Sequence, residues 1–368
     1  MNLGQTVRGG PGIYVCAAGA LDHLNELTKR FQKVHLITGK QSFAAFQQFW
    51  KHSLIWPIHR YDGTSSHEDM DRLQMEIGSA DLIIGIGGGR VLDTAKGVSH
   101  RLHARLICVP TVLGTCAAAT PLSIIYNTQG EHVGRDHFEE TAYAALVDLQ
   151  LLVHSPKPYF IAGIGDTLAK WYEARAIRRQ PVQAADPFVT LGLSAALETK
   201  DLLRRYAIDA VSSLERGEVT PAFQIVADTI IGVSAMVGSC ARDYGRASGA
   251  HAVHNAMSKI KETANYQHGI KVAYGLLVLL TAEGEDQEVR KLLSFYKRIG
   301  LPYSLGAFIS GEQQAAQDIL VKACVETEIG FRFVFDPLTD DLIRHAFNRL
   351  EDIVRETGEK VQDMGDED

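Results

Sequence analysis

From Leu21 to Asp148, short apolar runs alternate with stretches in which apolar and polar positions follow a helical period. Such alternation is typical of repeated strand–helix–strand units around a parallel sheet. The predicted strands are Val34–Thr38, Leu54–His59, Asp81–Ile86, Ala104–Val109, Leu122–Tyr126 and Tyr143–Asp148. The predicted helices are Leu21–Phe31, Ser42–Trp50, His67–Ile77 and Val91–Arg101, each bounded by Gly, Ser or Pro.

The pattern changes after HSPKPYF (His154–Phe160), where two prolines are expected to break any continuing element. We therefore predict an α/β domain over residues 1–154 and an all-helical domain over residues 155–368. The acidic tail, residues 359–368, has little apolar content and is predicted to be frayed. The helices predicted in the second domain are Asp166–Arg178, Pro187–Ser213, Pro221–Met236, Gly249–Lys261, Lys271–Glu283, Gln287–Ile299, Glu312–Val325 and Asp340–Glu356.

Composition narrows the class of partner. The 368 residues are 46% hydrophobic and 22% charged, ordinary values for a folded protein with a sizeable core. A net charge of -7 gives no electrostatic reason to bind nucleic acid or an anionic membrane, which favours a small-molecule substrate. Five cysteines without a CxxC pair indicate reduced thiols. We see no signal peptide and no run of ~18 apolar residues, so we expect a cytoplasmic protein.

One predicted strand ends in a run of glycines, within GIGGGRVLDTAKG. Gly87, Gly88 and Gly89 lead directly into a predicted helix, and backbone N–H groups at such a helix start can bind a phosphate. The run departs from the usual dinucleotide fingerprint, because Arg90 or Leu92 stands where its third glycine belongs. It therefore predicts either a pyrophosphate site or a tight strand-to-helix turn.

The next strand ends in a second stretch of small polar residues, ICVPTVLGTCAAATPLSIIY. Thr111, Thr115 and Cys116 follow its carboxyl end, which is where open α/β sheets bind ligands. The alternative is that these hydroxyl groups only cap turns.

Three oxygen or nitrogen ligands lie near the starts of predicted helices: Asp166 in AGIGDTLAKWYEA, His251 in HAVHN and His268 in YQHGIKVAYG. Such a set can hold a metal and leave a fourth tetrahedral position open. His251 and His254 would share one helix face, although two histidines can also be hydrogen-bonded near a surface. Lys170, four residues after Asp166, is either a nearby cation or a surface lysine.

The ordered set GGGRVLDTAK, PTVLGTCAAATPLSIIY, GIGDTLAKWYEA, HAVHN and HGIKVAYG resembles the metal-dependent, iron-containing type of alcohol dehydrogenase, in its glycerol dehydrogenase branch. By motif, the resemblance covers about Val34–Leu280. It implies a dehydroquinate synthase-like fold, with a nicotinamide-binding α/β domain, a helical catalytic domain and a divalent metal in the cleft. It also implies hydride transfer between NAD(P)(H) and a metal-bound alkoxide or carbonyl, and a homo-oligomer.

Carried over to this chain, the resemblance implies that Asp166, His251 and His268 are the metal ligands. His254 would sit beside the metal as an orienting or proton-relay group. The cofactor residues that the resemblance implies are Gly87, Gly88 and Gly89 for the pyrophosphate, Asp93, and Thr111, Thr120, Leu122 and Tyr126 for the nicotinamide half.

Cys116 departs from the glycerol dehydrogenase pattern, which carries an Asp at the aligned position on the substrate side. Without that carboxylate a polyol loses a charge-assisted acceptor, and an anionic substrate loses a repulsive neighbour. The TCAAATPLS segment is similar to a sub-branch that acts on 2-hydroxy or 2-oxo carboxylic acids. Such an acid is the expected substrate, with glycerol or another polyol as the alternative.

Thr38, Gly39 and Lys40 depart from the pattern of NAD-preferring members, which carry an Asp for the adenosine ribose. The change removes repulsion against a 2'-phosphate and adds a cation, so NADP(H) is expected to be preferred over NAD(H). A Gly-Lys pair after a strand is also a common turn. Lys170 stands where iron-using relatives have a third His, so Zn²⁺ is expected first and Fe(II) second.

Two rival functions use the same motifs. A lyase resembling dehydroquinate synthase would need several cations around a substrate phosphate, and the metal-proximal segments offer Lys170, Arg242, Arg246 and Lys271. A regulatory protein that binds the dinucleotide without turnover is disfavoured, because all three candidate metal ligands are present.

Overall fold

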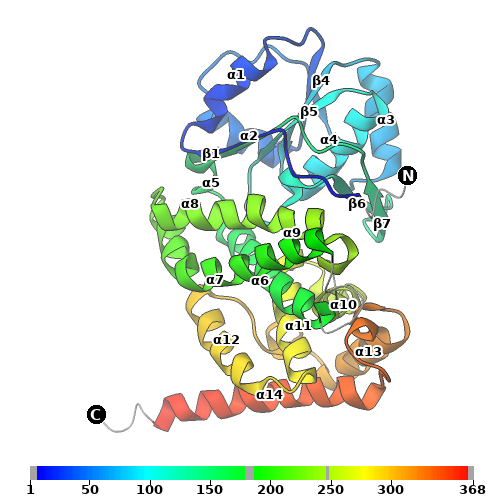
Figure 1. The fold of residues 1–368 in the computed structure, drawn as a ribbon, viewed down its shortest axis with the longest axis vertical. Coiled ribbons are helices and arrows are strands. Elements are labelled where there is room, and N and C mark those ends of the chain that lie inside the picture. Colours follow the sequence, from blue (N-terminus) through cyan, green and yellow to red (C-terminus); the bar gives the residue numbers. More distant parts are fainter. Residues whose placement is uncertain (1–5, 179–185, 246–247, 364–368) are drawn as a thin grey trace.

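The computed structural model describes residues 6–178, 186–245 and 248–363. Figure 1 shows a sheet with its helices above a larger assembly of helices. The main sheet is fully parallel and has the strand order β1-β8-β5-β4-β2-β3. Its strands are β1 (Ile13–Ala17), β2 (Val34–Thr38), β3 (Ile58–Arg60), β4 (Leu82–Gly87), β5 (Arg105–Pro110) and β8 (Ala144–Asp148).

The central strand β4 is buried along its whole length, because helices cover both faces of a parallel sheet. The helices of this half are α1 (His23–Thr28), α2 (Lys40–Phe49), α3 (His67–Ile77), α4 (Gly89–Arg101) and the short α5 (Leu149–Leu152). The predicted parallel-sheet class is therefore confirmed, with most elements within a few residues of their predicted bounds.

The structure differs from the predicted strands in the start of one strand, the sheet that another belongs to, and two strands that were missed. The predicted strand Leu54–His59 begins only at Ile58, after Pro57, which has no N–H to give to a neighbouring strand. The strand Leu122–Tyr126 (β6) exists, but it pairs antiparallel with β7 (His132–His137) in a separate two-stranded sheet. Neither β1 nor β7 was predicted, since β1 is an edge strand in a Gly-rich segment and β7 has a polar sequence without apolar alternation.

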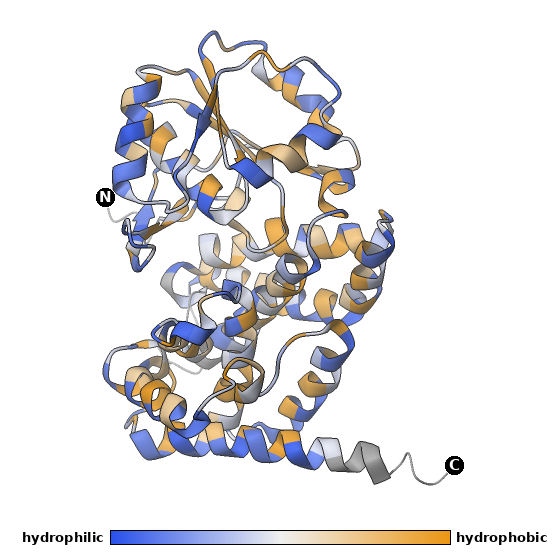
Figure 2. Cartoon of the chain, turned by 180° about the vertical axis from the view of Figure 1, so that it is seen from behind, coloured by the Kyte–Doolittle hydropathy of each residue, from blue (hydrophilic) through white to orange (hydrophobic). Residues whose placement is uncertain are grey.

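All strands among the described residues lie before residue 149, and the remainder is helical. Figure 2 shows polar positions gathered on outer helices such as the long α14. At the centre, α11 packs against α6, α10 and α14. The helices are α6 (Lys157–Arg178), α7 (Pro187–Arg216), α8 (Pro221–Asp228), α9 (Ser234–Ala241), α10 (Gly249–Met257), α11 (His268–Ala282), α12 (Asp286–Ile299), α13 (Gln313–Glu326) and α14 (Asp340–Asp363). The exact division into two domains at residue 154 stays a prediction.

Two helix boundaries correct the sequence analysis. Helix α6 begins at Lys157 rather than Asp166. Pro158 therefore lies in its first turn, where a missing N–H costs no helical hydrogen bond. The prolines separate α5 from α6, as predicted, and they also stand at the start of the second helix. Helix α14 runs to Asp363, so the predicted fraying does not hold for residues 359–363, because a formed helix extends cheaply through Glu, Lys and Gln. The remainder of the tail, 364–368, lies outside the described residues.

One helical segment is longer and more apolar than the sequence analysis expected. Pro221–Ala241 spans 21 residues, because a π-helical turn, Thr229–Val233, joins α8 to α9 without a break. An 18-residue stretch of it has a mean hydropathy of 1.5, so by length and composition alone it could cross a membrane. However, 61% of that stretch is buried inside the structure, which is the position of a core helix.

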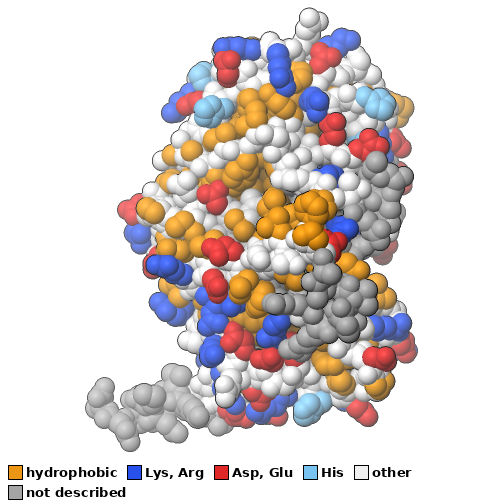
Figure 3. Space-filling model, in the orientation of Figure 1, with side chains coloured by type: hydrophobic (Ala, Val, Ile, Leu, Met, Phe, Trp, Pro, Cys, Tyr) orange, Lys and Arg blue, Asp and Glu red, His pale blue; other side chains and the backbone are white. Residues whose placement is uncertain are grey.

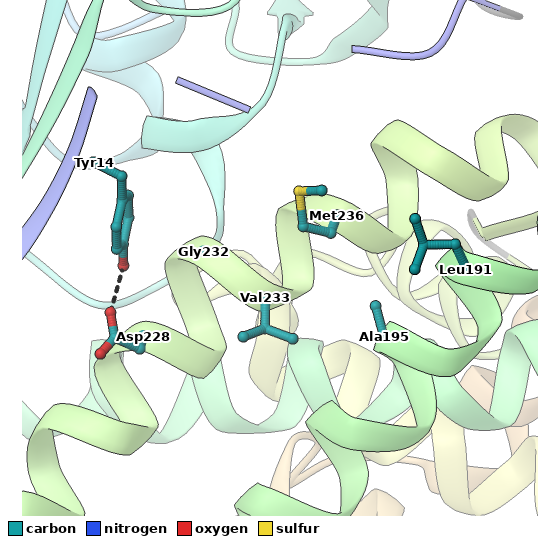
Figure 4. A pocket seen from close by; sticks show the side chains of 7 residues that line it. All are labelled: Tyr14, Leu191, Ala195, Asp228, Gly232, Val233 and Met236. Atoms are coloured by element: carbon teal, nitrogen blue, oxygen red, sulfur yellow. Dashed lines mark hydrogen bonds between the residues drawn. The ribbon is translucent and has the colours of Figure 1, made fainter. Parts of the chain in front are cut away.

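The two halves meet at β1 and the α8–α9 run. Tyr14 donates a hydrogen bond of 2.9 Å to Asp228 Oδ1 across this contact (Figure 4). Beside the bond lies a pocket whose other walls are Leu191, Ala195, Gly232, Val233 and Met236, none of which is a candidate metal ligand. Figure 3 shows apolar side chains gathered on this face. Phe188 and Leu191 of α7 are among the exposed large apolar side chains of the protein.

Candidate metal and cofactor site

Asp166, His251 and His268 come together from three different helices. Asp166 Oδ1 lies 3.2 Å from His268 Nε2 and 3.6 Å from His251 Nε2. The three ligand atoms lie within 4.8 Å of one another. A tetrahedral ion with bonds of ~2.1 Å separates its ligand atoms by about 3.4 Å, so the donor set fits a divalent metal.

Glycines allow these helices to approach closely enough. A Cβ atom at Gly269 would lie 2.0 Å from the carbonyl oxygen of Ala162, and one at Gly165 would lie 2.7 Å from Ala273 Cβ. These two contacts bring α6 against α11 beside Asp166 and His268. Similarly, a Cβ at Gly275 would lie 2.3 Å from the Ala250 carbonyl oxygen, which sets α10 against α11.

The sequence suggested that all three candidate ligands lie near helix starts, and the structure places only two of them there. His268 is the first residue of α11 and His251 the third of α10, but Asp166 lies in the middle of α6. Burial would raise the pKa of Asp166. Its hydrogen bond to His268 and the charge of Lys170 outweigh that effect and lower the pKa. Lys170 therefore acts electrostatically on the cluster, as a nearby cation.

Glu173 belongs to the site, although the sequence analysis did not single it out. Its buried carboxylate accepts hydrogen bonds from the backbone N–H groups of Ser248 and His251, at 2.7 and 3.1 Å. It also lies 2.8 Å from His251 Nδ1. Burial lowers the pKa of His251, but Glu173 and Asp166 outweigh this and raise it. The sequence signal that could have identified Glu173 is its position two helical turns after Asp166, on the same helix face.

His254 lies beside His268. Its Nε2 is 3.0 Å from His268 Nδ1, and its Nδ1 is 2.9 Å from Asn255 Oδ1. Burial lowers the pKa of His254 well below its usual value, and the neighbouring His268 and Lys271 act in the same direction. Both ring nitrogens are engaged within the protein. The role of His254 as a proton relay stays a prediction.

The glycine run forms the junction of β4 and α4. A Cβ at Gly87 would lie 2.5 Å from Val91 Cβ, and one at Gly88 would lie 3.1 Å from Val112. The loop after β5 lies against this junction, since Thr111 N donates to the Gly87 carbonyl at 3.1 Å. The two predicted ligand-binding stretches therefore adjoin at the carboxyl edge of the sheet, beside the N-terminus of a 13-residue helix.

The loop after β5 also contacts α6, the helix that carries Asp166. A Cβ at Gly163 of α6 would lie 2.0 Å from the carbonyl oxygen of Leu113. Gly163 precedes Asp166 by one helical turn, so this contact links the glycine-rich junction to the candidate metal ligands. Cys116 is half-buried at the start of the short 3₁₀ turn Ala117–Ala119, which ends at Thr120. Its place beside the substrate stays a prediction.

Asp93 has a structural role in addition to the one predicted for it. Its carboxylate accepts a hydrogen bond of 2.8 Å from Lys96 Nζ and one of 3.2 Å from Ile124 N. It thereby ties α4 to β6, the strand that begins at Leu122 and ends at Tyr126. Burial raises the pKa of Asp93, and Lys96 offsets part of the rise. Its contact with a cofactor, like those of Thr111, Thr120, Leu122 and Tyr126, stays a prediction.

Around the end of β2, Thr38 is buried and donates to the Ile86 carbonyl at 2.7 Å. Gly39 lies under Tyr61, which a Cβ would approach to 2.9 Å. Lys40 is exposed at the start of α2. Arg60, which was missed because it lies on a different strand, donates to the Gly39 carbonyl at 2.7 Å. Two cations therefore flank this corner.

Of the cations considered for a phosphate-eliminating lyase, Arg242 forms an ion pair with Asp186, and Lys271 Nζ lies 3.4 Å from Ser258 Oγ. Arg246 lies outside the described residues. These contacts do not bring the described cations among these four residues together into a phosphate-binding pocket.

Known proteins resemble this chain over most of its length. Residues 11–149 match the family model described as iron-containing alcohol dehydrogenase. The chain is 34% identical to hydroxycarboxylate dehydrogenase A of Escherichia coli, covering 93% of this chain and 96% of that protein. It is 30% identical to a glycerol dehydrogenase of Thermotoga maritima, covering 86% and 89%.

Among solved structures, a probable glycerol dehydrogenase from Sinorhizobium meliloti superposes with a TM-score of 0.84 at 27% identity, covering 95% of this chain and 99% of that one. The fold, the donor set and the relatives lead to one family. The chain belongs to the iron-containing alcohol dehydrogenase family, and it is an oxidoreductase of alcohol and carbonyl groups that uses a nicotinamide dinucleotide and a divalent metal.

Proposed function

We propose that this enzyme exchanges hydride between NADP(H) and a small 2-hydroxy or 2-oxo carboxylic acid, with one Zn²⁺ held by Asp166, His251 and His268. The observation that carries the proposal is the spacing of these three ligand atoms, all within 4.8 Å of one another. Fe(II) is the second choice of metal, because the set has one carboxylate and two imidazoles and no third histidine.

When bound, the metal lowers the pKa of a substrate hydroxyl or polarises a carbonyl. The protein supplies the position and the charge. The Asp166 side chain is 6% exposed and that of His268 is 38% exposed, so the accessible side of the cluster is the His268 side. The glycine junction and the start of α4 would bind the pyrophosphate, and the adjoining loop after β5 would hold the nicotinamide half.

The preference for an acid rests on Cys116. A neutral thiol in place of the carboxylate of glycerol dehydrogenases leaves the substrate side without a group that repels a carboxylate. The similarity to hydroxycarboxylate dehydrogenase A points the same way. Glycerol or another polyol is the second candidate, favoured by the similarity to glycerol dehydrogenases in sequence and in fold.

The preference for NADP(H) rests on the corner at the end of β2. Lys40 and Arg60 flank Gly39, and no acidic side chain stands at positions 38–40 to repel a 2'-phosphate. The ammonium group of Lys40 and the guanidinium group of Arg60 can instead pair with this phosphate.

A cytoplasmic, homo-oligomeric enzyme with a small-molecule substrate is the expected setting. None of the five cysteines is paired in a disulfide, which suits a reducing compartment. We retain the absence of nucleic-acid and membrane partners as a proposal, on the grounds of the net charge of -7 and the burial of the Pro221–Ala241 helix.

A substrate and cofactor panel on Zn²⁺-reconstituted protein tests the proposal. Oxidation of NADPH and of NADH is followed by absorbance with small 2-oxo acids and with dihydroxyacetone, and the reverse reaction is followed with glycerol. We expect a higher kcat/KM with NADPH and a 2-oxo acid than with any other combination. A higher kcat/KM for the polyol pair would replace the acid by the second candidate.

A further inference from the structure

A chain of hydrogen bonds leads from the metal cluster to an acidic side chain near the surface. His268 Nδ1 lies 3.0 Å from His254 Nε2, and His254 Nδ1 lies 2.9 Å from Asn255 Oδ1. Asn255 Nδ2 then donates to Glu328 Oε2 at 2.8 Å. Glu328 is half-buried and follows the end of α13, so four residues from three segments form one continuous chain.

The Glu328 carboxylate, at the end of this hydrogen-bonded chain, determines which group donates and which accepts in each of its hydrogen bonds. A carboxylate can only accept hydrogen bonds, so Glu328 holds the amide NH₂ of Asn255 toward itself and turns the amide oxygen toward His254. An amide oxygen also only accepts, so neutral His254 carries its proton on Nδ1. Its Nε2 is then an acceptor, and His268 must donate from Nδ1.

This direction places the Nδ1 proton of His268 toward His254 and leaves Nε2 to face the metal position, 3.2 Å from Asp166 Oδ1. Without the ion a proton on Nε2 bridges to that carboxylate, and a bound metal would replace this proton. His251 reaches the same state by a shorter route, because its Nδ1 lies 2.8 Å from the acceptor-only carboxylate of Glu173. In both imidazoles the protein thus holds a proton on Nδ1, so that Nε2 is the nitrogen that a metal would bind. A metal-binding histidine needs that tautomer, and hydrogen-bond partners of this kind raise metal affinity.

We infer that Glu328 is a positioning residue for the metal site. It fixes the tautomer of His268 from three hydrogen bonds away, as Glu173 fixes that of His251 directly. The inference rests on the proposed metal ligands, and it adds a residue that contacts neither the metal nor the substrate. Without the Glu328 carboxylate, the Asn255 amide can rotate so that its NH₂ faces His254. His254 would then donate to His268 Nδ1, and the proton of His268 would lie on Nε2.

The variant Glu328→Lys reverses the direction of donation along these hydrogen bonds. An ammonium group only donates, so it turns the Asn255 oxygen outward and the NH₂ toward His254, which must then donate to His268 Nδ1. The proton of His268 would face the metal position. We expect the affinity of the metal-free full chain for Zn²⁺, measured by competition with a chromophoric chelator, to fall about tenfold or more.

Glu326→Lys is the matched control. It makes the same change of charge two residues earlier, at a side chain that is 58% exposed and lies outside the hydrogen-bonded chain. Because an exposed charge is screened by solvent and salt, its Zn²⁺ affinity should stay within about twofold of wild type.

The double variant Asn255→Asp/Glu328→Gln exchanges the amide and the carboxylate. The carboxylate at position 255 still accepts from His254 Nδ1, and the amide at position 328 donates to it, so the direction toward His268 is kept. We expect Zn²⁺ affinity close to wild type. A role of Glu328 in packing or in overall charge alone would not predict this rescue.

The tautomer of His254 can be read directly from the imidazole ¹⁵N shifts of Zn²⁺-loaded, ¹⁵N-histidine-labelled wild-type protein. His254 should carry its proton on Nδ1, and a proton on His254 Nε2 would overturn the inference without any variant. Thermal unfolding midpoints of the metal-free variants, measured in parallel, separate loss of the tautomer from loss of the fold.

Two outcomes would reject the role of Glu328 alone: Zn²⁺ binding by Glu328→Lys equal to wild type, or an affinity of the double variant as low as that of Glu328→Lys. Equal Zn²⁺ affinity of wild type and His268→Ala would instead reject the proposed metal site, and the inference with it.

Discussion

Gly269 and Ala162 are in contact at the crossing of α11 and α6, where a Cβ on Gly269 would lie 2.0 Å from the Ala162 carbonyl oxygen. The same Cβ would lie 3.0 Å from Asp166 Cβ. The crossing therefore sets the distance between Asp166 and His268, which a helix of larger residues could not reach. Backbone atoms form the contact, so no side chain can move aside to relieve a clash.

Gly269→Ala tests this relationship. Forcing the helices apart should lower the free energy of unfolding by about 1–3 kcal/mol, measured by chemical denaturation, and weaken Zn²⁺ binding. Gly238→Ala in α9 is the control, because no atom lies within 4 Å of its Cβ position. That change should leave stability equal or raise it by up to about 1 kcal/mol, through helix propensity. Equal stability of both variants would contradict the close-packing argument.

His268→Ala should abolish turnover and metal retention together, because two remaining ligands do not hold the ion through gel filtration. Metal content is measured by elemental analysis, and activity with NADPH and a 2-oxo acid. His345→Ala removes an exposed imidazole of α14 and should change neither quantity. Full activity of His268→Ala would refute the ligand assignment.

Cys116→Asp should shift the substrate preference from acid to polyol. The new carboxylate would repel an anionic substrate, so we expect kcat/KM for the 2-oxo acid to fall about tenfold or more. Oxidation of glycerol should rise at the same time. Cys116→Ser keeps the size without the charge, and it should retain the acid preference. A parallel loss in both variants would assign Cys116 a packing role.

Lys40→Glu should raise the KM for NADPH about tenfold or more while leaving that for NADH nearly unchanged, because it replaces a cation for the 2'-phosphate by an anion. Lys51→Glu makes the same change of charge at an exposed position beyond the far end of α2 and is the control. Equal responses of the two cofactors would show that Lys40 does not discriminate between them.

Asp81 gives a pH-dependent contribution to stability. Its carboxylate accepts hydrogen bonds from the backbone N–H groups of Lys33 and Gln32, which lower its pKa in the folded protein. Its stabilising effect is therefore present at neutral pH and is lost as the pH falls below the ordinary value of about 4. The difference in Tm between wild type and Asp81→Asn should shrink over that range. A difference independent of pH would exclude the charge as its source.

The sequence by itself determined the local features of this protein. The apolar run before Gly87 predicted the buried strand β4, and the glycines predicted its junction with α4, because periodicity and glycine act over a few residues. Side-chain chemistry near predicted helix starts made Asp166, His251 and His268 candidate ligands, and the resemblance of their motifs to a known family assigned them that role. The errors concerned elements with weak local signals, such as β7 and the start of α6.

Only the tertiary structure decided which residues serve those ligands. Glu173 meets His251 from 78 positions away, Glu328 meets Asn255 from 73, and Arg60 meets Gly39 from 21. Each of these residues resembles an ordinary surface charge in the sequence. Their partners are fixed by how closely glycine-lined helices and parallel strands pack, and packing between distant segments leaves no periodic trace along the chain.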